Sequence, residues 1–119
     1  MKDELKFRHV SLKLKQRLNK AYGSKVRISR HDYKVTWCSE LVWHGKGICG
    51  LCDPGAKRIY VVADSVAGAL DTLIHEMAHA EFASSGLRYT TLWSPDLEEQ
   101  VVELMSQMIA SSFHLRRRA

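Results

Sequence analysis

The hydrophobic positions in the first part of the chain recur every four residues, with lysines and arginines between them. This spacing is shared by Val10, Leu14, Leu18 and Tyr22. One apolar position per helical turn is typical of an amphipathic helix that covers a core. We therefore predict an N-terminal helix over residues 8–22, ended by Gly23.

Between residues 25 and 62 the helical spacing gives way to short runs of β-branched and aromatic residues, separated by turn-forming pairs. The runs are KVRIS at 25–29, YKVTWC at 33–38, ELVWH at 40–44 and KRIYVVA at 57–63. Runs of this length between turn signals favour strands. They predict a small, mostly antiparallel sheet of three to four strands.

Helical periodicity returns after residue 65 in two segments. Ser65 is a suitable N-cap for a helix that ends before Gly86, and Ser94 followed by Pro95 is suited to begin a last helix. The predicted buried face of that last helix consists of Leu97, Val101, Leu104, Met105, Met108 and Ile109. The predicted elements make an α+β fold, and the chain length suits a single domain over residues 1–119.

The charge of the chain is uneven. Eighteen Lys and Arg against thirteen Asp and Glu give a net charge of +5, and the excess lies near the two ends. Basic ends can contact nucleic acid or an acidic partner, although a solvated helix face and a solubilising tail explain them as well. No apolar stretch has the roughly 18 residues of a membrane span, and the first residues lack the apolar core of a signal peptide. We expect a cytoplasmic protein.

The segment LIHEMAHAEF, residues 73–82, carries the candidate chemistry. His75 and His79 lie one turn apart on the same side of the predicted helix, so both imidazoles can bind one zinc ion. Glu76 is turned about 100 degrees away from His75, where it can act as general base toward a zinc-activated water. This arrangement predicts amide hydrolysis, although the H-E-x-x-H pattern alone also occurs in helices without a metal.

A catalytic zinc site needs a third protein ligand. No histidine lies between His79 and His114, so the candidates are Glu98, Glu99 and Glu103 in the last helix. Glu99 falls at the edge of the predicted apolar face, where two packed helices can close on an ion. Glu103, one turn later, can orient a ligand histidine. We favour Glu99 as the ligand, with Glu98, nearer the middle of that face, as the main alternative.

The segments LIHEMAHAEF and EEQVVELM resemble those of gluzincin metallopeptidases, over the stretch from Leu70 to Ile109. The small size is similar to that of minimal gluzincins and of the IrrE-type proteases of bacteria and phages. The resemblance implies a zincin-like fold, a protein or peptide substrate, zinc held by His75, His79 and Glu99, and Glu76 as the base. HEMAHA also resembles the SprT-type proteases that act on DNA-bound proteins, but these take a third histidine from a following segment.

Further roles can be assigned to residues outside this motif. In zincins a strand edge beside the active helix binds the substrate backbone, and KRIYVVA is the candidate here. Possible donors to an oxyanion are Tyr89, His44 and His114. A second, structural zinc site could use Cys38, His44, Cys49 and Cys52. Cys49 and Cys52 could instead form a redox pair, or all three cysteines could be buried thiols. The aromatic residues Trp37, Trp43 and Trp93 are expected in the core or at its rim.

The sequence also allows a function of a different class. In that alternative the chain is a regulatory or adaptor domain without catalysis, its metal is structural, and its basic ends, including Arg116, Arg117 and Arg118, contact nucleic acid or a protein partner.

Overall fold

The computed structural model describes residues 4–118, and it describes side chains for residues 4–109, 111 and 112. Within this range the fold is α+β, as predicted, with three α-helices and a mixed six-stranded sheet. In chain order the elements are β1 (Leu5–His9), α1 (Leu12–Tyr22), β2 (Lys25–Ile28), β3 (His31–Trp43), β4 (Lys46–Gly47), β5 (Gly50–Asp53), β6 (Arg58–Val62), α2 (Val66–Ser85), the short 3₁₀ helix η2 (Leu87–Tyr89) and α3 (Pro95–Arg118).

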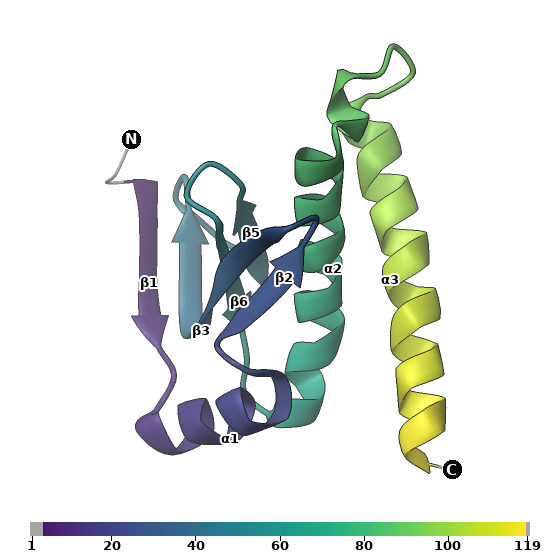
Figure 1. Cartoon of the computed structure of the whole chain (residues 1–119). Coiled ribbons are helices and arrows are strands. Elements are labelled where there is room, and N and C mark those ends of the chain that lie inside the picture. The colour runs from purple at the N-terminus through teal and green to yellow at the C-terminus, as the bar shows by residue number, and fades with distance from the viewer. Residues whose placement is uncertain (1–3, 119) are drawn as a thin grey trace.

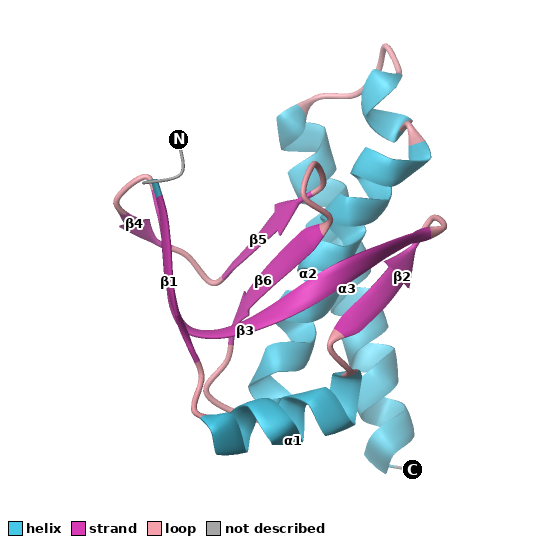
Figure 2. Cartoon of the chain, turned by 60° about the vertical axis from the view of Figure 1, so that its left-hand side comes forward, coloured by secondary structure: helices cyan, strands magenta, loops and turns pink. Residues whose placement is uncertain are grey.

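The long strand β3 organises the sheet. β1, β2 and β4 pair with it antiparallel, β6 pairs with it in parallel, and β5 pairs antiparallel with β6. The main path runs β1-β3-β6-β5, so β5 forms an edge of the sheet and β6 lies inside it (Figure 2). The predicted antiparallel character is correct, but the predicted number of strands is too low. The predicted strands YKVTWC and ELVWH are parts of β3, whereas the short strands β4 and β5, in a segment with several glycines, carry too little β-branched sequence to be recognised.

The N-terminal helix begins later than predicted. Arg8 and His9 belong to β1, and α1 starts only after Ser11, whose Oγ accepts a hydrogen bond from the backbone N–H of Leu14. Pairing of β1 with β3 supplies backbone hydrogen bonds that the local helical spacing cannot reveal. Gly23 ends α1 with a positive φ of 85°, as expected of a glycine at this position.

The main core lies between the sheet and the two helices α1 and α2. β3 contributes Val35 and Trp37 to this core, while the next residue, Cys38, faces a smaller cluster with Leu41 and Tyr60 on the other side of the sheet. Successive strand residues point to opposite faces, which explains this division. The Trp37 side chain is 2% exposed and donates from Nε1 to Asn19, so Trp37 is a core residue as predicted.

The caps of the last two helices are those predicted from the sequence. The Ser65 hydroxyl accepts a hydrogen bond from the N–H of Gly68, Gly86 adopts the left-handed conformation after α2, and the Ser94 hydroxyl accepts from the N–H of Leu97. α3 then runs back along α2, on the side of α2 that faces away from the sheet (Figure 1). Despite its 24 residues, neither α3 nor any other helix in the described part of the chain is long and apolar enough to cross a membrane.

The buried face of α3 differs from the predicted one. The residues that face α2 are Glu98, Val102 and Ser106, spaced four apart and each under 7% exposed. Most of the predicted apolar face lies in solvent instead, at Leu97, Leu104, Met105, Met108 and Ile109. α3 packs on a single neighbour, so it buries only a narrow strip. Two of the three buried residues are polar because that strip faces the histidine side of α2.

The position of α3 on α2 predicts a large effect on stability for one substitution in α3 and a small effect for another two residues away. Val102→Ala should lower the free energy of unfolding by about 2 kcal/mol, because Val102 is fully buried. Leu104→Ala should change it by less than about 0.5 kcal/mol, because Leu104 is 69% exposed. Denaturant unfolding of both variants measures the difference. A larger loss for Leu104→Ala would contradict this orientation of α3.

Candidate metal centre and its groove

His75 and His79 project from adjacent turns of α2 toward α3. Their Nε2 atoms lie 3.3 Å apart. Glu99, in the first turns of α3, places Oε1 2.9 Å from Nε2 of His75 and 3.4 Å from Nε2 of His79. The structure therefore brings together the three residues that the sequence suggested as ligands, and all three ligand atoms lie within 4.8 Å of one another.

The separations of these three atoms suit a small tetrahedral metal ion. Ligand atoms about 2.0–2.2 Å from a zinc ion at tetrahedral angles are about 3.3–3.6 Å from each other. The observed separations of 2.9 to 3.4 Å are close to this range. Two imidazole nitrogens with one carboxylate are also a donor set that zinc prefers. The residues present therefore fit a zinc ion.

The other nitrogen of each imidazole faces a carboxylate of α3. Nδ1 of His79 lies 2.6 Å from Oε2 of Glu98, and Nδ1 of His75 lies 3.4 Å from Oε2 of Glu103. A carboxylate at Nδ1 favours the tautomer whose Nε2 carries a free lone pair. Both rings are thus oriented to present Nε2 toward Glu99. Glu103 thus lies beside His75, as predicted from the sequence.

Glu98 has a structural role that the sequence did not reveal. Its side chain is 4% exposed, and Arg88 donates from Nε and Nη2 to its two oxygens, at 2.7 Å each. Trp93 donates from Nε1 to Oε1 at 2.9 Å. Burial by itself would raise the pKa of Glu98, but the hydrogen bonds from Arg88, His79 and Trp93 outweigh it and lower the pKa to about 2.

These contacts argue against Glu98 as the metal ligand. Both of its oxygens are already engaged by Arg88, and the cluster able to hold an ion contains Glu99 in its place. A carboxylate in the middle of a buried helix face requires a cationic partner. This requirement is the one signal in the sequence that could have pointed to Arg88. Trp93, expected only at a core rim, contributes an indole donor to the same cluster.

Glu76 follows His75 in α2 and is 7% exposed. Burial raises the pKa of Glu76, and the positive charges available on His79 and His75 counteract part of this rise. The carboxyl group packs directly on β5, since a Cβ atom at Gly50 would lie 2.8 Å from Oε2 of Glu76. The missing side chain at Gly50 therefore provides the space that the Glu76 carboxyl occupies.

Two hollows meet at this centre. The first, about 540 Å³, lies between α2, α3 and the start of β5, and we call it the Asp71 pocket. The second, about 410 Å³, extends toward Arg88 and Trp93, and we call it the Arg88 pocket. Both are lined by Gly50, His75 and Glu76. Together they form a groove that follows the edge strand β5 and passes over the candidate metal centre.

The substrate-binding strand expected from the sequence has to be corrected. KRIYVVA corresponds to β6, which is paired on both sides, with β3 and with β5. It has no free edge for an additional strand. The edge strand beside the groove is β5, whose residues Gly50, Leu51 and Cys52 line the Arg88 pocket.

The cysteines do not form the second metal site considered from the sequence. Cys38 faces the small cluster on one side of the sheet, whereas Cys52 packs against the main core on the other. Among the described residues, the only metal-compatible cluster of His, Cys, Asp and Glu is that of His75, His79 and Glu99. Burial raises the pKa of Cys38 to about 11, and burial together with the charge of Glu76 raises that of Cys52 to about 12. Both thiols therefore stay protonated, which disfavours metal binding and redox chemistry.

Two of the oxyanion donors suggested from the sequence, Tyr89 and His44, do not lie in the groove. Tyr89 is 89% exposed in η2, and His44 contacts Glu4 in the turn after β3. Neither residue lines the Asp71 pocket or the Arg88 pocket. The side chains of His114 and of Arg116, Arg117 and Arg118 lie outside the described residues.

Comparison of the chain with models of protein families, with curated proteins and with solved structures found no match.

Proposed function

We propose that the protein is a zinc-dependent peptidase in which His75, His79 and Glu99 hold the metal and Glu76 is the general base. The observation that carries this proposal is the convergence of two Nε2 atoms and one carboxylate oxygen, 2.9 to 3.4 Å apart, in a groove that the buried Glu76 also lines. A sheet, the histidine helix α2 and the glutamate helix α3 are also the parts of a minimal gluzincin, and we propose a zincin-like layout for them.

The number of candidate ligands favours catalysis over a structural metal. Structural zinc sites are usually closed by four protein ligands, whereas catalytic sites have three and leave one position for water or substrate. The described residues supply three ligands here, and the groove passes directly over them. The alternative of a non-catalytic adaptor with a structural metal lacks a fourth ligand among these residues.

The residues around the centre have separate tasks in the proposed reaction. Zinc, when bound, supplies Lewis acidity that lowers the pKa of water to about 7. Glu76 accepts a proton from water and delivers it to the amine released from the broken peptide bond. The free edge of β5 binds the peptide backbone as an added strand.

Metal analysis of the purified protein, combined with a peptidase assay, tests this proposal. We expect one zinc ion per chain and hydrolysis of unstructured peptides that a chelator abolishes and added zinc restores. The variants His75→Ala and His79→Ala should lose both zinc and activity. Stoichiometric zinc without hydrolysis of any peptide would favour the adaptor, whereas an absence of zinc would contradict both functions.

Substitution of Gly50 tests how Glu76 is positioned. In Gly50→Ala the new methyl group would lie 2.8 Å from both Oε2 of Glu76 and Cγ2 of Thr72, so the carboxyl group must move. We expect hydrolysis to fall by roughly 10- to 100-fold, with zinc content unchanged. Gly47→Ala is the matched control, because its methyl group would meet no atom within 4 Å. Equal activity of the two variants would show that the Glu76–Gly50 contact has no role.

A further inference from the structure

One side of α3 carries a line of exposed apolar residues that faces neither α2 nor the groove. α3 packs on α2 and forms an outer layer of the molecule (Figure 1). Leu104 and Met108 are 69% and 64% exposed, and Leu97 is 44% exposed. Together with the partly exposed Val101, we call these residues the outer stripe. Apolar residues gathered on one exposed face are typical of an interaction surface.

The outer stripe has the spacing of a coiled-coil seam. Leu97, Val101, Leu104 and Met108 follow one another at intervals of four, three and four residues. This alternation aligns the side chains along one line of a helix, so that a second helix with the same spacing can pack its side chains between them. The stripe therefore fits a helix as its partner.

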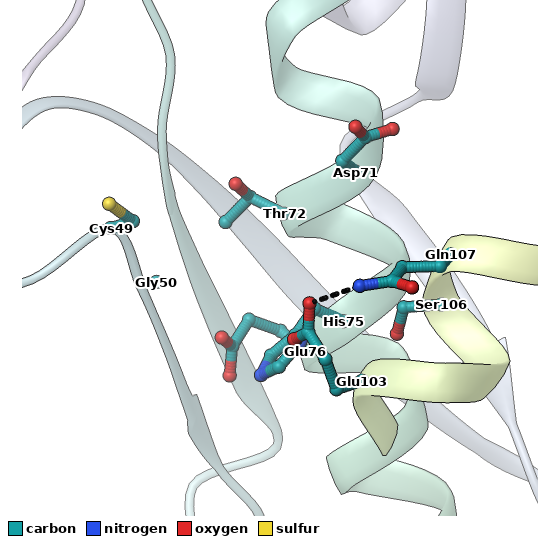
Figure 3. Close-up of a pocket in the computed structure, with 9 residues that line it drawn as sticks. All are labelled: Cys49, Gly50, Asp71, Thr72, His75, Glu76, Glu103, Ser106 and Gln107. Atoms are coloured by element: carbon teal, nitrogen blue, oxygen red, sulfur yellow. Dashed lines mark hydrogen bonds and ion pairs between the residues drawn. The ribbon is translucent and has the colours of Figure 1, made fainter. Parts of the chain in front are cut away.

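The groove lies on the other flank of α3. Glu103, Ser106 and Gln107 line the Asp71 pocket from that flank (Figure 3). Glu103 and Gln107 are each followed directly by a residue of the outer stripe, which is turned about 100 degrees further around the helix. A helix bound to the stripe therefore leaves the groove accessible.

The residues beside the outer stripe favour a second copy of the same chain as its partner. Gln100 and Gln107 flank the stripe on one side, and Met105 and Ile109 flank it on the other. Because none of these four residues is charged, they do not repel an identical helix, and they offer no charge for a different partner of opposite sign to match.

The charges at the two ends of α3 favour an antiparallel arrangement of the two copies. The first turn of α3 contains Asp96, and the sequence at its other end contains three arginines at 116–118. Antiparallel helices place the acidic beginning of one copy beside the basic end of the other. With the twofold axis level with Ser106, Leu104 of each copy meets Met108 of the other copy.

The area of the outer stripe is sufficient for a dimer of modest affinity. The exposed parts of the stripe and of Met105, which is 42% exposed, amount to roughly 400–500 Å² per copy. Two copies, with the polar residues at the rim, would bury roughly 1,000–1,200 Å², which is the lower end of specific interfaces. A dissociation constant of roughly 1–100 µM is expected for such a contact.

From these observations we infer that two copies of the chain associate through the outer stripe, with their α3 helices antiparallel. The two α3 helices form the centre of the dimer, and the groove of each copy lies outside the contact. This inference does not rest on the proposed peptidase function.

Sedimentation velocity of the whole chain, from about 1 µM to several hundred micromolar, tests this inference. The average mass should rise from that of one copy to that of two. Leu104→Glu places a charge in the contact and should raise the dissociation constant by about 100-fold or more. Leu12→Glu is the matched control, because Leu12 is 70% exposed on α1, and it should leave the dissociation constant unchanged. If circular dichroism shows that Leu104→Glu loses helix, Met108→Lys replaces it with the same expectation.

A pair of opposite charges tests the antiparallel arrangement. In the variant that carries both Leu104→Glu and Met108→Lys, each new carboxylate faces a new ammonium group of the other copy. Its dimer should be about 10-fold tighter than that of Leu104→Glu alone. In a parallel dimer like charges would face each other, so a double variant no tighter than the single one would overturn the antiparallel arrangement.

Unfolding at two protein concentrations gives an independent measurement. The small effect expected of Leu104→Ala holds for the separate chain, so this variant should lose stability relative to wild type only at concentrations at which the dimer forms. Val102→Ala should lose the same stability at both concentrations, because Val102 faces α2 within one copy.

The mass of one copy at every concentration, or a dimer that Leu104→Glu and Met108→Lys leave unchanged, would overturn the inference. If a monomeric protein bound phosphatidylglycerol vesicles and Leu104→Glu did not, the outer stripe would belong to a membrane surface. Zinc content and hydrolysis of the same variants should equal those of wild type, since the stripe lies outside the groove. The dimer and the peptidase can therefore fail separately.

Discussion

Glu76→Gln is expected to reduce peptide hydrolysis by about 100- to 10,000-fold while the protein keeps its zinc. Glutamine has the shape of glutamate but cannot accept a proton from water. Glu76 is not one of the three residues whose atoms converge, so the candidate ligand set is unchanged. The measurements are kcat with the best peptide and zinc content per chain.

A matched variant on the same helix controls for the loss of charge. Glu81 accepts a hydrogen bond from Ser29 and lines neither half of the groove. Glu81→Gln should therefore retain wild-type activity. If Glu76→Gln also remained fully active, Glu76 would not be the general base. In that case the buried glutamate would need another explanation.

Glu98→Ala is expected to lower the free energy of unfolding of the metal-free protein by about 3–5 kcal/mol. Glu98 accepts hydrogen bonds from Arg88 and Trp93 and contacts His79, and its side chain is 4% exposed. Removing it leaves the guanidinium and the indole N–H without their acceptor. Because His79 also loses the carboxylate at Nδ1, zinc affinity should fall by roughly 10- to 100-fold.

Substitution of the next residue, Glu99, is expected to affect zinc binding rather than stability. Glu99 is 60% exposed on its side chain, so Glu99→Ala should change the stability of the metal-free protein by less than about 1 kcal/mol. The same substitution should abolish stoichiometric zinc binding. Denaturant unfolding without metal and a zinc titration distinguish the two variants. If the Glu98→Ala protein were stable but bound no zinc, Glu98 would be the ligand and the roles assigned to the two glutamates would have to be exchanged.

Only the structure separates these two glutamates. They are adjacent in the chain, about 100 degrees apart around the helix, and their roles depend on how α3 is rotated against α2. The apolar residues of α3 suggested one rotation, but the helix adopts another in which Glu98, Val102 and Ser106 face α2. The ion pair of Glu98 with Arg88 and the contacts to both histidines stabilise this rotation, and both connect residues distant in the sequence.

The groove likewise depends on contacts that local patterns do not contain. A strand is at an edge or inside a sheet according to which other strands pair with it, and β6 gains a neighbour on each side. β5 has a short sequence without clear alternation, yet it forms the edge beside the centre. The space that Gly50 leaves for Glu76 arises from the packing of β5 on α2.

The sequence by itself determined the features that depend on neighbouring residues: the caps at Ser65, Gly86 and Ser94, the α+β class, and the placement of His75, Glu76 and His79 around one helix. These follow from backbone geometry within one or two turns. The rotation of α3, the edge position of β5, the partner of Glu98 and the carboxylate-lined Asp71 pocket were decided only by the tertiary structure. Each of them depends on groups far apart in the chain whose distances are set by packing.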